Sequence, residues 1–199
     1  MKKPIKILIS GYFNSGKSTL IKSLDQDAVV IEKKLSNAYS KEKTQTTTGF
    51  DLGRIIWLRP NLSPDTMGQL MSESDYENNK SKFEGWDVKQ VELKGVPGKM
   101  HFSIIRSILA KRCDGVVFLI DGSEMESLKK ALEVLEETKN YLNNDIPIVI
   151  IANKSDKKDF QGSLKISSVI GEDVLEGSAI TKKGIPEAII LILKRVLGE

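Results

Sequence analysis

The sequence predicts a three-layer α/β fold, in which helices cover both faces of a mostly parallel, six-stranded sheet with one antiparallel strand. The first observation behind this prediction is that short apolar runs alternate with stretches of helical periodicity. The second is that residues 116–120 and 148–151 are continuously apolar, as expected for central strands buried on both faces. With 199 residues, 40% of them hydrophobic and 29% charged, the chain is expected to form a single domain, residues 1–199, around one core.

The remaining elements follow from local patterns. Further strands are predicted at 5–9, 50–58, 88–93 and 174–175. Helices are predicted where apolar side chains recur at the helical spacing, at 17–24, 127–141 and 186–196. The first helix follows the first strand after a turn that contains glycine, so the chain begins with a strand–turn–helix unit.

One stretch, from about 59 to 87, breaks the alternation. It contains prolines and many Ser, Asn, Asp and Glu residues, and it lies between two predicted strands where a tight hairpin would suffice. Loops of this length are usually functional or mobile. Because the stretch is too short and too polar to bury a core of its own, we predict a mobile surface insertion and no second domain, with Trp86 docking its end.

Composition and the chain ends argue against several kinds of partner. The 30 basic residues are nearly balanced by 27 acidic ones along the chain, so no nucleic-acid partner is expected. Cys113 is the one cysteine, which predicts a small, half-buried thiol in a reducing compartment. The sequence shows no membrane-spanning run, signal peptide or lipidation signal, so we expect a cytoplasmic protein without a direct membrane anchor.

The most informative motif is GYFNSGKS at residues 11–18, between the first strand and the first helix. It matches the pattern G-x-x-x-x-G-K-[ST], in which glycines let backbone N–H groups converge on nucleotide phosphates at a helix N-terminus. Lys17 is expected to place its ammonium group between the β- and γ-phosphates, where it acts in catalysis, and Ser18 to ligate Mg²⁺. The predicted nucleotide-binding residues of this loop are Asn14, Ser15, Gly16, Lys17, Ser18 and Thr19.

A second motif, Asn-Lys-Ser-Asp at 153–156, follows the apolar run 148–151, at the edge where a parallel sheet presents ligands. The Asp156 carboxylate can accept two hydrogen bonds from the ring N–H and the amino group of guanine, which adenine cannot supply. Asn153 is expected to reach the other edge of the base, and the stem of Lys154 to lie along the ring face. A polar loop after a strand is the alternative, which the phosphate loop upstream disfavours.

A third segment follows the last predicted strand. Here a backbone N–H within Ser178, Ala179 and Ile180 is expected to donate to guanine O6. The signal is weak alone, but its order in the chain and its position fit a guanine-nucleotide site.

The order of these motifs resembles the small Ras-like GTPases, which share the P-loop fold: a phosphate loop, a threonine-rich segment, an x-x-P-G turn, Asn-Lys-x-Asp and Ser-Ala. The resemblance covers nearly the whole chain apart from 59–87. It is greatest to the bacterial and archaeal branch, which includes the gliding-polarity GTPases and relatives of the Arf and signal-recognition-particle-receptor β subunits. It implies GTP and GDP as ligands, Mg²⁺ as cofactor, and effector and regulatory proteins as partners.

The resemblance also implies a first switch, whose threonine ligates Mg²⁺ and senses the γ-phosphate. Thr47 is expected to take this role because of its spacing to Gly49 and Phe50. Thr46 and Thr48 are alternatives. A threonine run that simply begins a strand is a further one, because threonine favours strands.

The second switch departs from the family pattern Asp-x-x-Gly-Gln, since residues 95–99 are Gly-Val-Pro-Gly-Lys. Gly98 keeps the N–H that would bond the γ-phosphate, but Gly95 removes the carboxylate that steadies Mg²⁺ through water. Lys99 stands where a glutamine orients the attacking water, and an ammonium group has no acceptor for that purpose. His101 is a candidate to approach the γ-phosphate as a catalytic group, and an exposed loop histidine is the alternative.

Three functions are open at this point. The leading one is a GTP-dependent molecular switch with slow or partner-assisted hydrolysis, in which Thr47 and Gly98 close on the γ-phosphate. The second is a non-hydrolysing interaction module that holds a guanine nucleotide, which Gly95 and Lys99 favour. The third is an ATP-dependent kinase or ATPase, which Asp156 disfavours.

Overall fold

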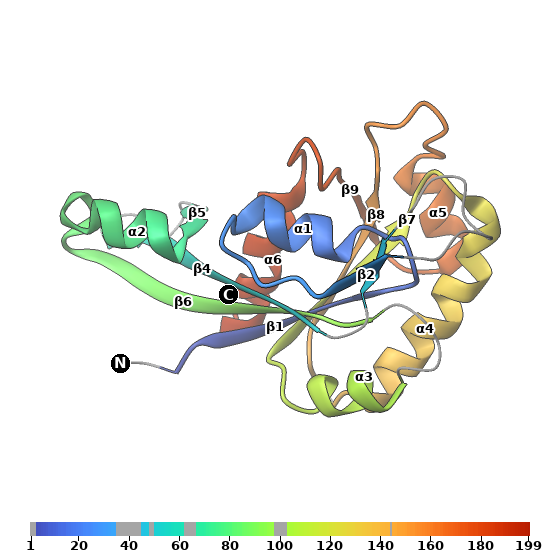
Figure 1. The fold of residues 1–199 in the computed structure, drawn as a ribbon, viewed down its shortest axis with the longest axis horizontal. Helices are drawn as coiled ribbons and strands as arrows, with labels where there is room; N and C mark the ends of the chain where they lie inside the picture. Colours follow the sequence, from blue (N-terminus) through green and yellow to red (C-terminus); the bar gives the residue numbers. More distant parts are fainter. Residues whose placement is uncertain (1–2, 35–44, 48–49, 62–66, 98–102, 144) are drawn as a thin grey trace.

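A seven-stranded sheet forms the centre of the molecule, in the order β5-β4-β6-β1-β7-β8-β9 (Figure 1). The computed structural model describes residues 3–34, 45–47, 50–61, 67–97, 103–143 and 145–199. The strands of the sheet are β1 (Ile5–Gly11), β4 (Asp51–Pro60), β5 (Gln69–Ser72), β6 (Trp86–Gly95), β7 (Gly115–Asp121), β8 (Ile148–Asn153) and β9 (Val174–Glu176). β4 runs antiparallel to both of its neighbours, whereas the other pairings in the sheet are parallel. The predicted mostly parallel α/β fold is confirmed.

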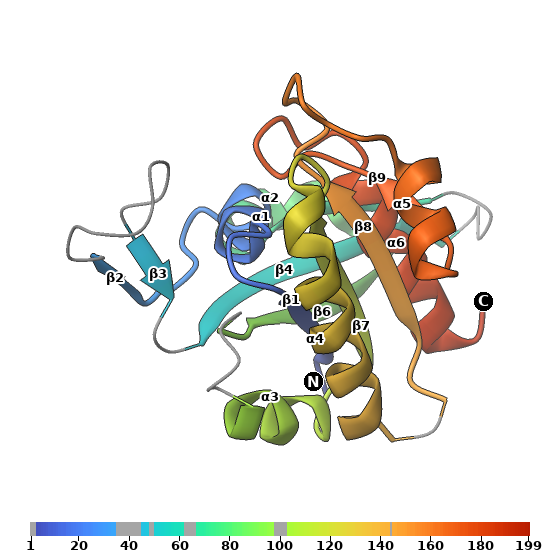
Figure 2. The ribbon, with the colours of Figure 1, turned by 90° about the vertical axis from the view of Figure 1, so that its right-hand side faces the viewer.

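The described sheet has one strand more than the six that the sequence predicts. The additional strand is β5, which lies within the insertion and pairs with β4 at the edge of the sheet. It has only four residues, too few for an apolar alternation to be recognised. A separate two-stranded ribbon consists of β2 (Glu32–Lys34) and β3 (Gln45–Thr47), and Figure 2 shows it beside the main sheet.

Helices cover both faces of the sheet and produce the predicted three layers (Figure 2). They are α1 (Lys17–Leu24), α2 (Glu73–Asn79), α3 (Ser103–Ala110), α4 (Leu128–Tyr141), α5 (Ser163–Ile170) and α6 (Ile185–Leu197). α1 and α6 pack on one face, where Leu20 and Ile189 join the largest buried cluster. α4 and α5 pack on the other face, against Phe118 and Ile150.

The three helices that the sequence predicts are present, as α1, α4 and α6. The sequence did not predict α3 and α5, each of which has eight residues, or about two turns. In α5 the apolar residues also do not mark one buried face, because Leu164 and Val169 are 86% and 52% exposed. No described helix has the length and apolar character needed to cross a bilayer.

The insertion has more regular structure than its sequence predicts. After the end of β4 it contains β5, α2 and a short 3-10 turn, and then it enters β6 at Trp86. Tyr76, Phe83 and Trp86 form a small apolar cluster against Ile56 and Leu58 of β4. The ring of Trp86 stands edge-on to that of Phe83, with 5.4 Å between centroids, so the predicted docking of Trp86 is confirmed. The insertion does bury a small cluster, because β4 and β6 extend into it and supply the apolar side chains that it lacks.

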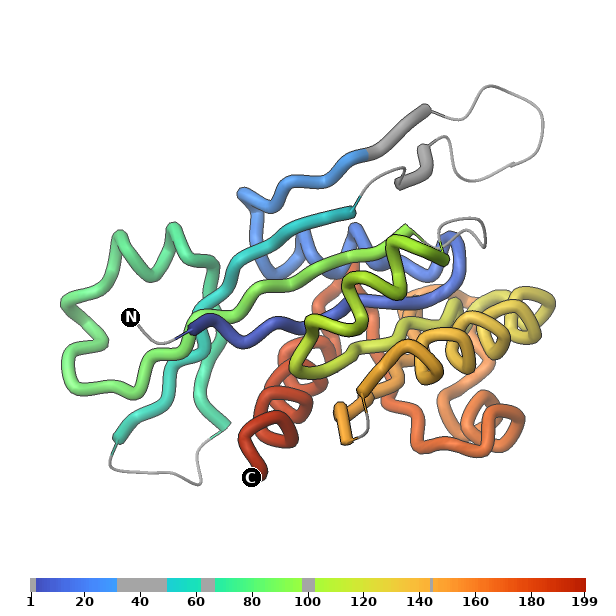
Figure 3. The backbone as a smooth tube through the Cα atoms, turned by 90° about the horizontal axis from the view of Figure 1, so that it is seen from below, coloured from blue at the N-terminus to red at the C-terminus, as the bar shows by residue number. Residues whose placement is uncertain are grey.

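The described part of the insertion lies at the end of the sheet opposite to the phosphate loop. β6 is parallel to β1, and Val91 of β6 pairs with Ile5 near the start of β1. The insertion therefore precedes the amino ends of these strands, whereas residues 11–18 follow the carboxyl end of β1. Figure 1 and Figure 3 show α2 and β5 projecting from the body of the molecule on that side.

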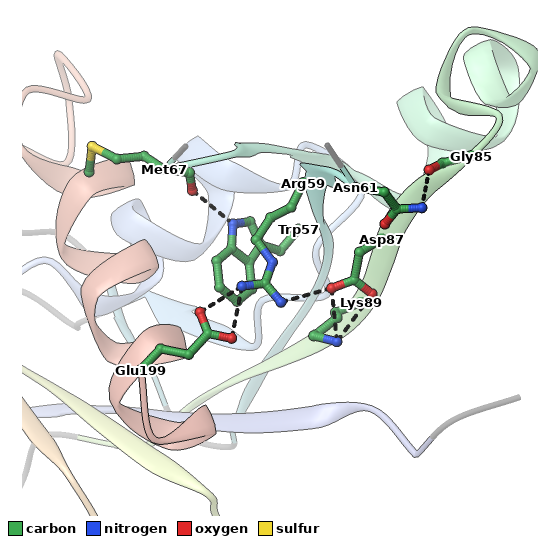
Figure 4. A network of polar contacts seen from close by, with 8 residues as sticks. All are labelled: Trp57, Arg59, Asn61, Met67, Gly85, Asp87, Lys89 and Glu199. Atoms are coloured by element: carbon green, nitrogen blue, oxygen red, sulfur yellow. Dashed lines mark hydrogen bonds and ion pairs between the residues drawn. The ribbon is translucent and has the colours of Figure 1, made fainter. Parts of the chain in front are cut away.

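A polar network anchors the base of the insertion to the end of α6 (Figure 4). Arg59 donates to both carboxylate oxygens of Glu199, at 2.9 and 2.6 Å, and to Asp87 at 2.8 Å. Its guanidinium group lies 4.4 Å from the ring centroid of Trp57. The hydrogen bond to Glu199 raises the pKa of Arg59, although burial opposes the shift. Burial would raise the pKa of Asp87, but hydrogen bonds from Arg59 and Lys89 hold that pKa below its ordinary value.

Cys113 is more buried than the sequence predicts, at 8% exposure, and its Sγ donates to the carbonyl of Ala110 at 3.1 Å. Burial, followed by the neighbouring Asp114 carboxylate, raises the pKa of the thiol to about 11. The folded protein therefore favours the neutral thiol, and this contribution to stability is lost as the pH rises from the ordinary thiol pKa of 9.0 through about 11.

We expect Cys113 to react slowly with a thiol-specific disulfide reagent at pH 8, because only the thiolate attacks and burial suppresses it. A pKa of about 11 against an ordinary 9.0 leaves about a hundredfold less thiolate. A reagent that releases a coloured thiolate when it reacts measures this rate. The reaction should be at least about a hundredfold slower with the native protein than with the chain unfolded in guanidinium chloride. Equal rates in the two states would contradict the burial of the thiol.

Candidate functional site

The phosphate loop connects the carboxyl end of β1 to the start of α1, as predicted. Gly11 has φ 140° and Gly16 has φ 99°, conformations that favour glycine. A Cβ on Gly11 would lie 2.2 Å from the carbonyl oxygen of Leu119, so the loop also needs glycine for close packing on β7. Asn14 takes a left-handed conformation as well, with φ 63°. These residues produce the tight curl that lets successive N–H groups converge.

The start of α1 has the features that the predicted phosphate site requires. Gly16 caps the helix without a side-chain hydrogen bond, and no acidic residue lies in the first turn, so the positive end of the helix is not neutralised there. Lys17 is only 6% exposed. Its Nζ lies inside the loop and donates to the carbonyls of Gly11 at 2.9 Å and Tyr12 at 2.7 Å. The structure therefore holds a buried cation within the loop, with Thr19 exposed beside it.

Two buried oxygen-bearing side chains meet at the first turn of α1. Ser18, the predicted Mg²⁺ ligand, donates from Oγ to Oδ2 of Asp51 at 2.7 Å. They are 8% and 1% exposed. Mg²⁺ prefers oxygen ligands, commonly one or two protein groups together with phosphate oxygens, so the residues present here fit that ion. The sequence analysis missed Asp51, although its place at the start of an apolar strand was a visible signal.

Asn153 joins the two halves of the predicted site. Its Nδ2 donates to the carbonyl of Ser15 at 2.8 Å, and its Oδ1 accepts from the N–H of Ala179 at 2.8 Å. A Cβ on Gly16 would lie 2.2 Å from the same Nδ2, so the loop and the amide are in close contact. Sequence reasoning did not predict this bridge. The Asn153 amide retains one further N–H and further lone pairs, which could still contact the base. That contact stays a prediction.

The side chains after Asn153 are held by charged and polar partners. Lys154, with φ 70°, pairs through Nζ with Oδ2 of Asp121 at the end of β7. This pair orients the stem of Lys154, and Asp121 was not predicted from the sequence. Asp156 is exposed, and its Oδ1 accepts from Oγ of Ser178. Oδ2 of Asp156 makes no hydrogen bond or ion pair with the residues that the structure describes. One oxygen is therefore positioned by the protein while the other faces outward.

The turn after β9 lies against this group. Ser178 is fully buried, and Ala179 is 3% exposed. The N–H of Ala179 is already used by Asn153, whereas within the described chain the N–H of Ile180 has no protein acceptor. Ile180 itself is 70% exposed. The structure thus brings together the residues predicted at 14–19, 153–156 and 178–180.

The predicted switch residues are placed only in part. Thr46 and Thr47 belong to β3, in which Thr47 pairs with Glu32 of β2, but their side chains lie outside the described residues. Backbone and side chain alike, Thr48, Gly98, Lys99 and His101 lie outside the described residues. Gly95 ends β6, and Val96 and Pro97 are buried directly after it. The roles predicted for Thr47, Gly98, Lys99 and His101 stay predictions.

Comparison with known proteins agrees with this site. Residues 6–154 match the family described as 50S ribosome-binding GTPase. ADP-ribosylation factor-like protein 3 of Saccharomyces cerevisiae is 26% identical over 208 aligned residues, covering 98% of this chain and 87% of that protein. ADP-ribosylation factor-related protein 1 of Rattus norvegicus is 26% identical, covering 96% and 84%. The mutual gliding-motility protein MglA of Myxococcus xanthus is 31% identical over 107 residues, covering 46% and 54%.

The matched region contains the phosphate loop, Asp51 and Asn153, so it spans the elements on which the site is built. The chain therefore belongs to the 50S ribosome-binding GTPase family and is a small Ras-like P-loop GTPase.

Proposed function

We propose that this protein is a molecular switch that binds GTP or GDP together with Mg²⁺ and hydrolyses GTP slowly or with the assistance of a partner. The observation that carries the proposal is the Asn153 bridge. It connects the loop for phosphates with the residues for guanine, at 2.8 Å on each side. A bound nucleotide would then contact both halves of one connected site.

Each group has a defined task in this proposal. Lys17 and the N–H groups at the start of α1 would bind the β- and γ-phosphates, and Ser18 would ligate Mg²⁺. The cation supplies charge neutralisation at the phosphates. Asp156, positioned by Ser178, would accept from the guanine ring N–H and amino group, and the N–H of Ile180 is suited to donate to O6.

The segment of the second switch is anchored at both of its ends. Arg106 of α3 is 1% exposed, donates to the carbonyl of Pro97 at 3.2 Å and pairs with Glu137 of α4 at 2.6 Å. Arg106 thereby ties Pro97, which precedes residues 98–102, and α3, which follows them, to α4. Fixed ends favour a switch in which Gly98 moves while α3 and α4 stay in place.

Hydrolysis is proposed to be slow because Lys99 replaces the glutamine that orients water. We expect single-turnover hydrolysis of GTP by the purified protein to be slow, and the substitution Lys99→Gln to raise its rate about tenfold, or about 1.4 kcal/mol off the barrier. Quench-flow or phosphate-release assays at saturating protein measure this rate. Lys94→Gln, a matched change in β6, should leave it unchanged.

A wild-type rate on the order of one per second without a partner would contradict slow intrinsic hydrolysis. If neither the wild type nor Lys99→Gln hydrolyses GTP, even with cell extract, the second function is favoured. In that case Gly95 and Lys99 would mark a non-hydrolysing interaction module that holds a guanine nucleotide. Effector and regulatory proteins as partners, and a cytoplasmic location, belong to the proposal as well.

A further inference from the structure

A buried carboxylate stands beside the serine that is proposed to hold Mg²⁺. Asp51 begins β4 and is 1% exposed. Its Oδ2 accepts from Ser18 Oγ at 2.7 Å, and its Oδ1 accepts from the N–H of Ile31 at 3.3 Å. Burying a carboxylate costs free energy unless its oxygens are used. The two hydrogen bonds offset part of that cost and hold the carboxylate next to Ser18.

The strand register shows which group Asp51 replaces. Asp51 lies directly opposite Gly95 in the antiparallel pair of β4 and β6. Residues in such a pair point to the same face of the sheet. A Cβ on Gly95 would lie 3.1 Å from Cβ and 3.2 Å from Oδ2 of Asp51. The Asp51 carboxylate thus fills the space into which a side chain at position 95 would point, and position 95 is where the family pattern has its aspartate.

We propose that Asp51 supplies the carboxylate of the Mg²⁺ site, displaced from β6 to the neighbouring strand β4. This inference rests on the proposed function, since it assumes that Mg²⁺ accompanies the nucleotide at Ser18. Asp51 acts as a positioning residue. It accepts a hydrogen bond from Ser18 Oγ, which orients the lone pairs of that oxygen toward a cation, and it adds a negative charge beside that cation.

The second oxygen of Asp51 links the same carboxylate to the first switch. Ile31 directly precedes β2, and Glu32 of β2 pairs with Thr47 of β3. One side chain therefore contacts both α1, through Ser18, and the segment that leads to the predicted switch threonine. The loss of Asp51 should weaken the binding of Mg²⁺ through both connections.

The test is the Mg²⁺ dependence of the release of fluorescently labelled GDP. For Asp51→Asn, which has nearly the same shape, we expect the half-saturating Mg²⁺ concentration to rise about 10- to 100-fold, as for other residues that orient metal ligands. Release in excess EDTA should stay within about threefold of the wild type, because Asp51 is proposed to act through the cation that EDTA removes.

The matched control is Asp25→Asn. Asp25 is also a buried carboxylate, at 5% exposure, and it accepts from the N–H of Arg54 at 2.8 Å. It lies at the opposite end of α1 from Ser18, so its removal should change stability without changing the half-saturating Mg²⁺ concentration.

A swap of the two positions provides a second, independent test. In the double variant Asp51→Gly/Gly95→Asp, the carboxylate returns to β6, and the half-saturating Mg²⁺ concentration should recover toward the wild-type value. Gly95→Asp alone should not improve on the wild type, because its Cβ would lie 3.1 Å from Cβ and 3.2 Å from Oδ2 of Asp51. Ile21 Cδ1, the end of a side chain at 2.7 Å from that Cβ, has to shift in both variants.

The inference is overturned if Asp51→Asn leaves the half-saturating Mg²⁺ concentration unchanged, or if it accelerates GDP release equally with Mg²⁺ and with EDTA. If Asp51→Asn does not fold, the double variant decides. The inference is overturned if GDP release from the folded double variant does not depend on the Mg²⁺ concentration. A wild-type protein that binds no GDP would instead overturn the proposed function, so the two failures are distinguishable.

Discussion

Replacing Lys17 with alanine is expected to reduce the affinity for GTP and GDP about a hundredfold or more. Lys17 is 6% exposed, and its ammonium group lies within the curl of the phosphate loop, where its attraction for phosphates is weakly screened. Hydrogen bonds to charged groups contribute about 1.5–3 kcal/mol, and about 3 kcal/mol corresponds to roughly a hundredfold in affinity. Titration of fluorescently labelled GDP in Mg²⁺ measures the effect.

Lys17 also contacts the loop itself, so the fold has to be checked separately. Its Nζ approaches Ser15 Oγ at 3.3 Å as well as the carbonyls of Gly11 and Tyr12. Thermal unfolding without nucleotide should show that Lys17→Ala stays folded. Lys22→Ala, in the exposed last turn of the same helix, should bind GDP like the wild type. A Lys17→Ala protein that binds within threefold of the wild type would refute the assignment of the phosphate site.

Replacing Asp156 with asparagine is expected to reverse the base preference. The carboxylate would accept from two donors of guanine, whereas an asparagine amide presents an N–H to one of them. The loss of one hydrogen bond, the unfavourable donor–donor contact that replaces it, and the loss of charge from the other hydrogen bond together cost about 3 kcal/mol, or roughly a hundredfold in affinity for GDP. Xanthine carries a carbonyl where guanine carries its amino group, so the amide introduced by Asp156→Asn would donate to it and the affinity for xanthosine diphosphate should rise.

Competition of GDP, xanthosine diphosphate and ADP against labelled nucleotide measures this change directly. Asp156→Asn can still accept from Ser178 Oγ, so the local structure should be retained. Asp159→Asn is the control, because Asp159 is exposed and lies three residues beyond Asp156. A variant that keeps its preference for GDP would show that Asp156 does not read the base.

The sequence by itself determined the class of fold and the two groups of residues that form the candidate site. The octet at 11–18 is contiguous, and its flanking strand and helix follow from local apolar patterns, so no distant contact was needed to recognise it. The bounds predicted for α1 match those of the structure, those of α4 differ by one residue at its start, and those of α6 differ by one residue at each end. The residues at 153–156 could be predicted for the same reason.

Short elements with exposed apolar residues were not predictable in this way. α3 and α5 have two turns each, and β5 has four residues, so their periodicity is too brief to stand out. The insertion could not be interpreted from its own composition, because the apolar residues that cover its cluster come from β4. Tertiary packing decided all of these.

Only the tertiary structure decided how the parts of the site are connected. Asn153 and Ser15 are 138 residues apart in the chain, and Asp51 and Ser18 are 33 apart. The position of Asp51 opposite Gly95 depends on the register of β4 against β6, and a shift of one residue would turn it to the other face of the sheet. The sequence has glycine at position 95, and strand pairing places the Asp51 carboxylate opposite it.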